Sequence, residues 1–185
     1  MISDHDRSFY IGASDTQYVV GSWNTRSFEH WYLTKLGIAR MDYRNEAMQA
    51  GTAYEHKILE SLNRKGLEMD KQVIQGRLRV NLDGNTKDTV YEVKTYRWGK
   101  AFKPSKTYRE QVQVELYATG LRTAYIVAYA LQEEDYKNFF LPIEAGRLSF
   151  HPILYDEAFI AKRYLPRFRI LCQCLDEGRF PKEAW

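Results

Sequence analysis

The residues with the clearest chemical potential are Asp83, Glu92 and Lys94, which lie close together in the stretch LDGNTKDTVYEVKT. Side chains alternate across a β-strand, so Glu92 and Lys94 should lie on one face and Val93 on the other. Asp83 can join the first face if residues 84–88 form a hairpin turn. Two carboxylates beside an amine can hold Mg²⁺ and orient an attacking water, as phosphodiester hydrolysis requires. The spacing therefore predicts a metal-dependent nuclease centre.

A simpler interpretation is an exposed hairpin on which Glu92 and Lys94 merely pair with each other. The segment that follows favours the nuclease, because residues 97–109 hold five basic side chains, no acidic ones, and three aromatic rings between them. Basic charge interleaved with aromatics suits a surface that follows phosphates and stacks on bases. A solvated basic loop is the alternative. The basic residues that we predict to contact DNA are Arg97, Lys100 and Lys103.

Length and composition predict one folded domain spanning residues 1–185, with 44% hydrophobic and 15% aromatic residues. No apolar run approaches the roughly 20 residues of a membrane span, and the polar residues 1–7 do not resemble a secretory signal. Cys172 and Cys174 are too close on a predicted helix to pair well, so reduced thiols in a cytoplasmic protein are expected.

The same composition argues against other kinds of hydrolase. The four histidines are scattered without metal-ligand spacing, which disfavours a zinc enzyme. Two cysteines cannot hold a four-cysteine iron–sulfur cluster. No glycine-rich phosphate loop is present, so we do not expect ATP to be a cofactor. The net charge of +3 is modest and does not by itself indicate nucleic-acid binding.

Hydrophobic periodicity predicts an α/β (or α+β) fold, with elements in the order α, α, α, β, β, β, α, β, β, α and a central mixed sheet flanked by helices. Ser14 is the expected N-cap of the first helix, and Pro166 should kink the last one. The predicted helices cover residues 14–20, 29–36, 46–65, 108–119 and 155–177. The predicted strands cover residues 71–74, 77–82, 90–96, 123–131 and 138–143.

Several segments, taken in order, resemble the restriction-endonuclease-like superfamily with its PD-(D/E)xK signature. The nearest likeness is to lambda-type exonucleases and YqaJ-like phage recombinases. The resemblance covers about residues 7–130, implies a restriction-endonuclease-like core, and departs from the signature at Leu82, where the family has proline. The matching residues are Arg7; 11–15 with Gly21; Trp31 and Lys35; 51–55; Asp83 and Gly84; 92–94; and 108–113 with Tyr117, Ala118 and Gly120.

The resemblance implies roles for the acidic residues. Asp83, Glu92 and the carbonyl of Val93 would ligate Mg²⁺ or Mn²⁺. Glu55, on the third helix, would support a second metal ion, although an ordinary exposed helix carboxylate is the alternative. Lys94 would position the attacking water or help to deprotonate it, and would stabilise charge on the phosphorus centre.

The resemblance also implies contacts to water and DNA. Gln111 and Gln113 cannot share a helix face, and Gln111 is favoured to bond the attacking water or the DNA backbone, with a surface glutamine as the alternative. Arg7 and Ser14 resemble residues that hold the 5′-phosphate, since a guanidinium and a helix N-cap both bind anions. Alternatively, Ser14 only caps its helix and Arg7 lies in a tail.

The function implied is a Mg²⁺-dependent exonuclease that degrades linear double-stranded DNA from 5′-phosphorylated ends in phage or prophage recombination. A structure-selective endonuclease or nickase is one alternative, and a non-catalytic DNA-binding module is another. Implied partners are double-stranded DNA, a single-strand annealing protein, and further copies of the chain closed into a toroid.

Overall fold

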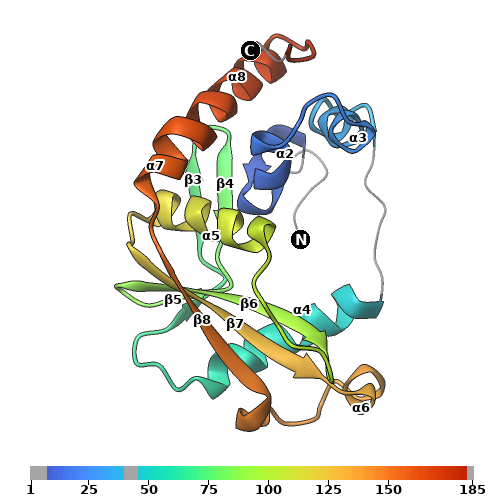
Figure 1. Cartoon of the computed structure of the whole chain (residues 1–185), viewed down its shortest axis with the longest axis vertical. Coiled ribbons are helices and arrows are strands. Elements are labelled where there is room, and N and C mark those ends of the chain that lie inside the picture. The colour runs from blue at the N-terminus through green and yellow to red at the C-terminus, as the bar shows by residue number, and fades with distance from the viewer. Residues whose placement is uncertain (1–7, 40–45, 183–185) are drawn as a thin grey trace.

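The computed structural model of the chain describes residues 8–39 and 46–182. It contains two sheets with helices between and around them (Figure 1). The helices are η1 (Ala13–Asp15), α2 (Thr16–Val20), α3 (Arg26–Lys35), α4 (Glu46–Ser61), α5 (Lys106–Thr119), α6 (Glu133–Lys137), η2 (Ala145–Arg147), α7 (Glu157–Phe159), the π-helical turn η3 (Ile160–Tyr164) and α8 (Leu165–Asp176). The strands are β1 (Ile11–Gly12), β2 (Glu68–Met69), β3 (Gln72–Gln75), β4 (Leu78–Asn81), β5 (Gly84–Asn85), β6 (Thr89–Arg97), β7 (Thr123–Leu131) and β8 (Leu148–Leu154).

The larger sheet has the strand order β2-β5-β6-β7-β8, and the smaller one the order β1-β4-β3. In the larger sheet only β6 and β7 are parallel, over nine residues each, and every other pair is antiparallel. In the smaller sheet β1 runs parallel to β4. The predicted α/β class with a mixed sheet flanked by helices is confirmed, and the second sheet was not predicted.

Strand β6 sends alternate side chains into two separate hydrophobic clusters. Val90 packs in the cluster that contains α5, α2, α3 and α8, whereas Tyr91 and Val93 pack in the cluster that contains α4. Figure 1 shows the corresponding arrangement, with α4 and α5 on opposite faces of the larger sheet. Glu92 and Lys94 share the parity of Val90, so both project toward α5.

Helix α5 is the crossover that joins the parallel strands β6 and β7. Its N-cap is Ser105, whose hydroxyl accepts from the backbone N–H of Tyr108, and it ends at Gly120 in the left-handed conformation (φ 74°) that favours glycine. It contacts strands of both sheets as well as α2 and η1. Because it lies between layers, polar side chains along it can be enclosed on more than one face.

A buried polar network links helix α4 to α6 and η2. Tyr54 donates from its hydroxyl to Asp135, which also accepts from Arg147 in a buried ion pair. Close packing adds to this at Gly84, where a Cβ would lie only 3.0 Å from a methyl carbon of Leu59 on α4. A larger residue at position 84 would therefore require the side chains of Leu59 and Leu67 to shift.

Two local predictions are wrong. Residues 138–143 do not form the edge strand, which is instead β8; segment 138–143 contains turn and irregular backbone. Ser14 is not an N-cap: it lies within η1, where the carboxylate of Asp15 accepts from the N–H of Gly12. The predicted last helix is present without interruption from Glu157 to Asp176, and it contains a π-helical turn, η3, that ends two residues before Pro166. Within the described residues, no helix is long and apolar enough to span a bilayer.

Candidate active site

Asp83 lies at the open edge of β6, just beyond the two-residue strand β5. Gly84 pairs with Tyr91, so Asp83 lies opposite Glu92, and its Oδ2 accepts a 2.7 Å hydrogen bond from the N–H of Val93. The expected hairpin is therefore formed by β5 and β6, with its turn closed by the N–H of Thr86 donating to the carbonyl of Thr89 (2.8 Å). Strand β4, which precedes Asp83, belongs to the other sheet. The side chain of Asp83 continues the ladder where β5 ends.

Glu92 and Lys94 are held side by side on the α5 face of β6. The Nζ of Lys94 donates to Oε1 of Glu92 at 2.5 Å, and Lys94 also lies over the ring of Tyr108, 4.9 Å from its centroid. Glu92 is buried, with 3% of its surface exposed. A buried carboxylate requires charged or hydrogen-bonding partners. The simpler interpretation, an exposed hairpin on which Glu92 and Lys94 merely pair, therefore does not apply.

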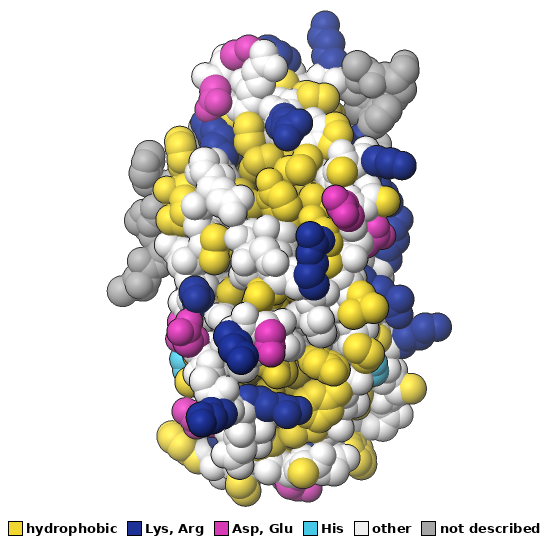
Figure 2. All heavy atoms as spheres, turned by 90° about the vertical axis from the view of Figure 1, so that its left-hand side faces the viewer, with side chains coloured by type: hydrophobic (Ala, Val, Ile, Leu, Met, Phe, Trp, Pro, Cys, Tyr) yellow, Lys and Arg dark blue, Asp and Glu magenta, His cyan; other side chains and the backbone are white. Residues whose placement is uncertain are grey.

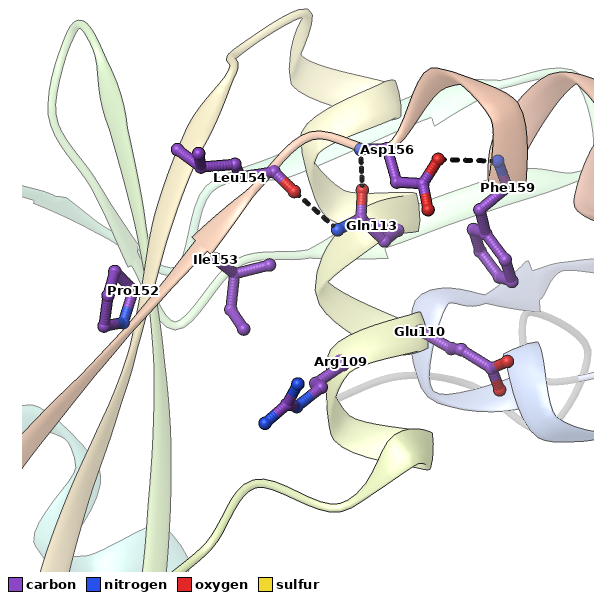
Figure 3. Close-up of a pocket in the computed structure, with 8 residues that line it drawn as sticks. All are labelled: Arg109, Glu110, Gln113, Pro152, Ile153, Leu154, Asp156 and Phe159. Atoms are coloured by element: carbon purple, nitrogen blue, oxygen red, sulfur yellow. Dashed lines mark hydrogen bonds between the residues drawn. The ribbon is translucent and has the colours of Figure 1, made fainter.

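Gln111 completes the polar contacts of Glu92 from the other side. Its Nε2 donates to Oε1 of Glu92 at 2.6 Å and to Oε1 of Glu115, one helical turn further along α5, at 2.9 Å. Gln113 faces elsewhere, donating to the carbonyl of Leu154 and accepting from the N–H of Asp156 (Figure 3). There it lines a hollow of about 380 Å³ between α5, β8 and α7. Of the two glutamines, only Gln111 contacts the acidic centre.

Glu55 reaches the same edge from α4, on the other side of the sheet. Burial raises the pKa of this carboxyl, and the charge of Glu92 raises it further. Half-buried Glu55 also forms a cluster with the exposed residues His56 and Asp70, in which one ligand atom from each residue lies within 4.8 Å of the others. The imidazole of His56 contacts the carboxylate of Asp70 at 2.9 Å. This histidine–aspartate pair was not anticipated, because Asp70 comes from the turn before β3.

The carboxyls of the centre perturb one another's protonation. Burial, followed by the charges of Glu92 and Glu55, raises the pKa of Asp83 well above its usual value. Burial and the charges of Glu92 and Asp83 do the same to the pKa of Glu115. For Lys94, burial would lower the pKa, but the charge and hydrogen bond of Glu92 outweigh it and raise the pKa. At neutral pH Lys94 is therefore an ammonium cation.

The donor set fits a divalent cation with oxygen ligands. Asp83, Glu92, Glu55 and Glu115 supply carboxylates around one edge of β6, and one oxygen of Glu115 (Oε2) is buried with no hydrogen-bond partner among the described residues. Mg²⁺ and Mn²⁺ both favour carboxylate and carbonyl oxygens. Asp83, Glu92 and the Val93 carbonyl are the residues that would hold the ion, and a cation there would relieve the mutual repulsion of the carboxylates.

The raised pKa of Glu115 predicts how stability depends on pH without metal. A carboxyl whose pKa is higher in the folded state than in the unfolded state stabilises the fold when protonated, and this stability is lost as pH rises. Glu115→Gln should therefore be more stable than the parent in EDTA at pH 8, with a smaller difference at pH 5, where the parent carboxyl keeps its proton. Each pH unit in that window changes the difference by up to about 1.4 kcal/mol.

Urea unfolding of the two proteins at several pH values measures that difference directly. Taking the difference cancels the histidines and surface carboxyls that both chains share. A gap in unfolding free energy that stays constant from pH 5 to pH 8 would contradict a perturbed carboxyl at this position.

Of the two residues predicted to hold a 5′-phosphate, the structure describes only Ser14. Arg7 lies outside the described residues, and Ser14 is exposed within η1, which packs against α5. The neighbouring Asp15 is tightly held: it accepts from Trp31 Nε1 at 2.9 Å and forms an ion pair with Lys35 at 2.8 Å. The shape of this turn near α5 thus depends on Asp15, and binding of a 5′-phosphate by Arg7 and Ser14 stays a prediction.

The basic segment after β6 is exposed, but most of its aromatic rings are not free to stack on bases. Arg97, Lys100 and Lys103 are exposed, as is Trp98, with 53% of its surface accessible. Phe102 instead packs between Tyr96, Tyr108 and His151. Trp98 is therefore the ring of this segment that is available for stacking.

Positive charge is not confined to that loop. Figure 2 shows lysine and arginine side chains spread over one face of the molecule and projecting along one edge, beside two areas of hydrophobic side chains. Charge of this kind attracts polyanions from several directions without selecting a sequence.

Glu115 is the residue of the centre that the sequence analysis missed. It lies between Val114 and Leu116, both fully buried, so from the sequence it appears as a single charge in an apolar stretch of helix. The one available signal was its spacing of four from Gln111, which places both side chains on the same helix face.

Comparisons with known proteins bear on the fold. No protein-family model and no curated protein matches the sequence. Among solved structures, the alkaline exonuclease LHK-Exo from Laribacter hongkongensis is similar, with a TM-score of 0.70 and 19% identity over 93% of this chain and 90% of that one. LHK-Exo in complex with dAMP gives 0.67 and 18%, over 94% and 93% of the two chains. A phage-related exonuclease from Haemophilus somnus 129PT gives 0.68 and 13%, over 91% and 94%. The chain therefore has the restriction-endonuclease-like fold of these exonucleases.

Proposed function

We propose that the protein is a nuclease that hydrolyses DNA with the help of a divalent metal ion, and more narrowly an exonuclease acting on linear duplex DNA. The observation that carries the proposal is the convergence of Asp83, Glu92, Lys94 and Gln111 at one sheet edge. The similar solved structures are described as exonucleases, and one of them binds dAMP, a nucleotide. That likeness supports the substrate class.

The side chains have separable tasks in this proposal. A bound Mg²⁺ or Mn²⁺ would activate a water and neutralise phosphate charge. Asp83 and Glu92 hold the ion, and Glu55 supports a second one. Because the raised pKa keeps Lys94 cationic, it acts as a donor that stabilises charge on the phosphate and not as the base that removes a proton. Gln111 steadies Glu92 and is placed to contact the attacking water.

The narrower parts of the proposal concern the DNA end that is recognised, the direction of digestion and the protein partners. We propose digestion from 5′-phosphorylated ends, with Arg7 and Ser14 at the phosphate and Arg97, Lys100 and Lys103 along the DNA backbone. A single-strand annealing protein, assembly into a toroid, a recombination role and a cytoplasmic location remain predictions from the family resemblance.

The proposal is tested with three matched DNA substrates in Mg²⁺: linear duplex with 5′-phosphate, the same duplex without it, and closed circular DNA. We expect rapid release of nucleotides from the phosphorylated duplex, slower release from the unphosphorylated one, and an intact circle. Ser14→Ala should remove the preference for phosphate with less effect on the unphosphorylated duplex.

Other results of this experiment would indicate a different function. Nicking or linearisation of the circle would show an endonuclease of the same fold. Salt-sensitive binding with no cleavage in Mg²⁺ or Mn²⁺ would show a DNA-binding module and refute the enzymatic proposal.

A further inference from the structure

Helix α5 contributes a fourth carboxylate to the centre, Glu115, to which the proposed function gives no task. Glu115 has no exposed surface, and its backbone neighbours Val114 and Leu116 are buried as well. Burying a carboxylate in such surroundings costs free energy unless the carboxylate is paired or hydrogen-bonded. Among the residues that the structure describes, its one hydrogen bond from another side chain comes from the amide of Gln111.

The amide of Gln111 is oriented by two acceptors. Its Nε2 carries two hydrogens, and the structure directs this nitrogen to Oε1 of Glu92 at 2.6 Å and to Oε1 of Glu115 at 2.9 Å. Since a carboxylate oxygen accepts, turning the amide over would place its carbonyl oxygen against both carboxylates. The contact with Glu115 therefore excludes the flipped amide more firmly than the contact with Glu92 alone would.

This orientation has a consequence on each side of Gln111. Toward the sheet, Glu92 Oε1 receives both Lys94 Nζ and Gln111 Nε2, so its carboxylate plane is fixed by two donors. With Nε2 directed to both carboxylates, the carbonyl oxygen of Gln111 is the part of the amide that is left to meet a substrate. A carbonyl accepts hydrogen bonds, so it can bind an O–H of water but not an unprotonated phosphate oxygen.

We propose that Glu115 is a positioning residue: it anchors Gln111 so that the amide N–H fixes the metal-binding carboxylate of Glu92 and the amide oxygen faces the attacking water. The part about water rests on the proposed function. The orientation of Glu92 by Gln111 concerns metal binding alone, and it does not depend on which reaction the centre catalyses. Glu115 acts through Gln111 and as a hydrogen-bond acceptor, so its negative charge is not what is required.

The test is a double-mutant cycle read out by Mn²⁺ binding, measured by calorimetry or electron paramagnetic resonance on the full chain. Partners of metal ligands usually contribute about 10–100-fold to affinity. We expect Glu115→Leu to weaken Mn²⁺ binding by about tenfold, at the lower end of that range. Gln111→Leu should weaken it at least as much, and the double variant no more than Gln111→Leu alone. Glu115→Gln, which keeps an acceptor oxygen, should bind nearly as tightly as the parent.

Three outcomes would overturn the proposal. Unchanged affinity in Glu115→Leu would show that the anchor is unnecessary. Losses that multiply in the double variant would show that Glu115 acts on the metal independently of Gln111. A Glu115→Gln variant as weak as Glu115→Leu would show that charge matters, and that the buried, unpartnered Oε2 is itself a metal ligand.

DNA cleavage provides a separate readout. If the parent cuts DNA, Glu115→Leu should lower kcat and leave KM for DNA unchanged, with Glu115→Gln restoring most of kcat. If the parent binds Mn²⁺ and follows the predicted cycle but cuts no DNA, the proposed function fails and the anchoring role stands. Melting curves in EDTA identify any variant that has not folded.

Discussion

Replacing Lys94 by methionine is expected to slow DNA hydrolysis by about 10²–10³-fold, the usual loss when one donor that stabilises transition-state charge is removed. Methionine keeps much of the length of the lysine stem and its packing, but it removes the cation. The ammonium of Lys94 is held by Glu92 at 2.5 Å and stays charged because its pKa is raised. Single-turnover cleavage of phosphorylated linear duplex at saturating Mg²⁺ measures the step that should be affected.

A matched control separates this effect from general loss of positive charge. Lys137, an exposed lysine on α6 that pairs with Glu133, can be changed to methionine in the same way. Lys137→Met should cleave DNA like the parent. If Lys94→Met, correctly folded, also keeps full activity, the sheet edge described here is not the catalytic centre.

Asp83→Asn is expected to have two opposite effects. Hydrolysis should fall by roughly 10³-fold, because metal ions contribute several kcal/mol of charge stabilisation and each 1.36 kcal/mol changes the rate tenfold. The free energy of unfolding without metal should rise, because an amide relieves the repulsion from Glu92 and Glu55 that raises the pKa of Asp83. The asparagine oxygen can still accept from the N–H of Val93, so the end of the β5–β6 ladder is retained.

Both effects can be measured on one preparation, by cleavage in Mg²⁺ and by urea unfolding in EDTA. Glu134→Gln, at an exposed carboxylate of α6, serves as the control and should change neither. A destabilised and inactive Asp83→Asn would contradict the predicted repulsion at this position and would leave the loss of activity attributable to a disturbed fold. A fully active variant would exclude Asp83 from metal binding.

The parts of the fold that could be predicted are those with a strong local pattern. The apolar run of β7 has the bounds expected from the sequence, residues 123–131, and the alternation in β6 correctly places Glu92 and Lys94 together. Helix α5 begins at Lys106, two residues before the predicted start, with Ser105 as its N-cap, and it ends at Gly120 as predicted. In each case the hydrophobic periodicity and the residues that mark the ends of the element indicate the same bounds.

The features that the sequence did not predict have physical reasons. Strand β8 includes His151 and Pro152 and is mostly exposed or half-buried, so it lacks the apolar alternation of a typical strand. The two-residue strands β2 and β5 are too short to carry any periodicity, which is why the division into two sheets was not foreseen. Glu115 escaped notice because α5 is enclosed between layers, and enclosure is a property of the tertiary arrangement.

The parallel pairing of β6 and β7 also governs when the centre can come into existence. Each residue of β6 pairs with one 34 positions later, for example Thr89 with Thr123, and α5 occupies the interval. Such pairing requires closing a long loop, which makes it a slow, non-local step in folding. An incomplete chain emerging during synthesis thus has the acidic side chains of β6 and α5 before β7 fixes their geometry. The arrangement of these side chains is therefore fixed only after β7 has been synthesised and has paired with β6.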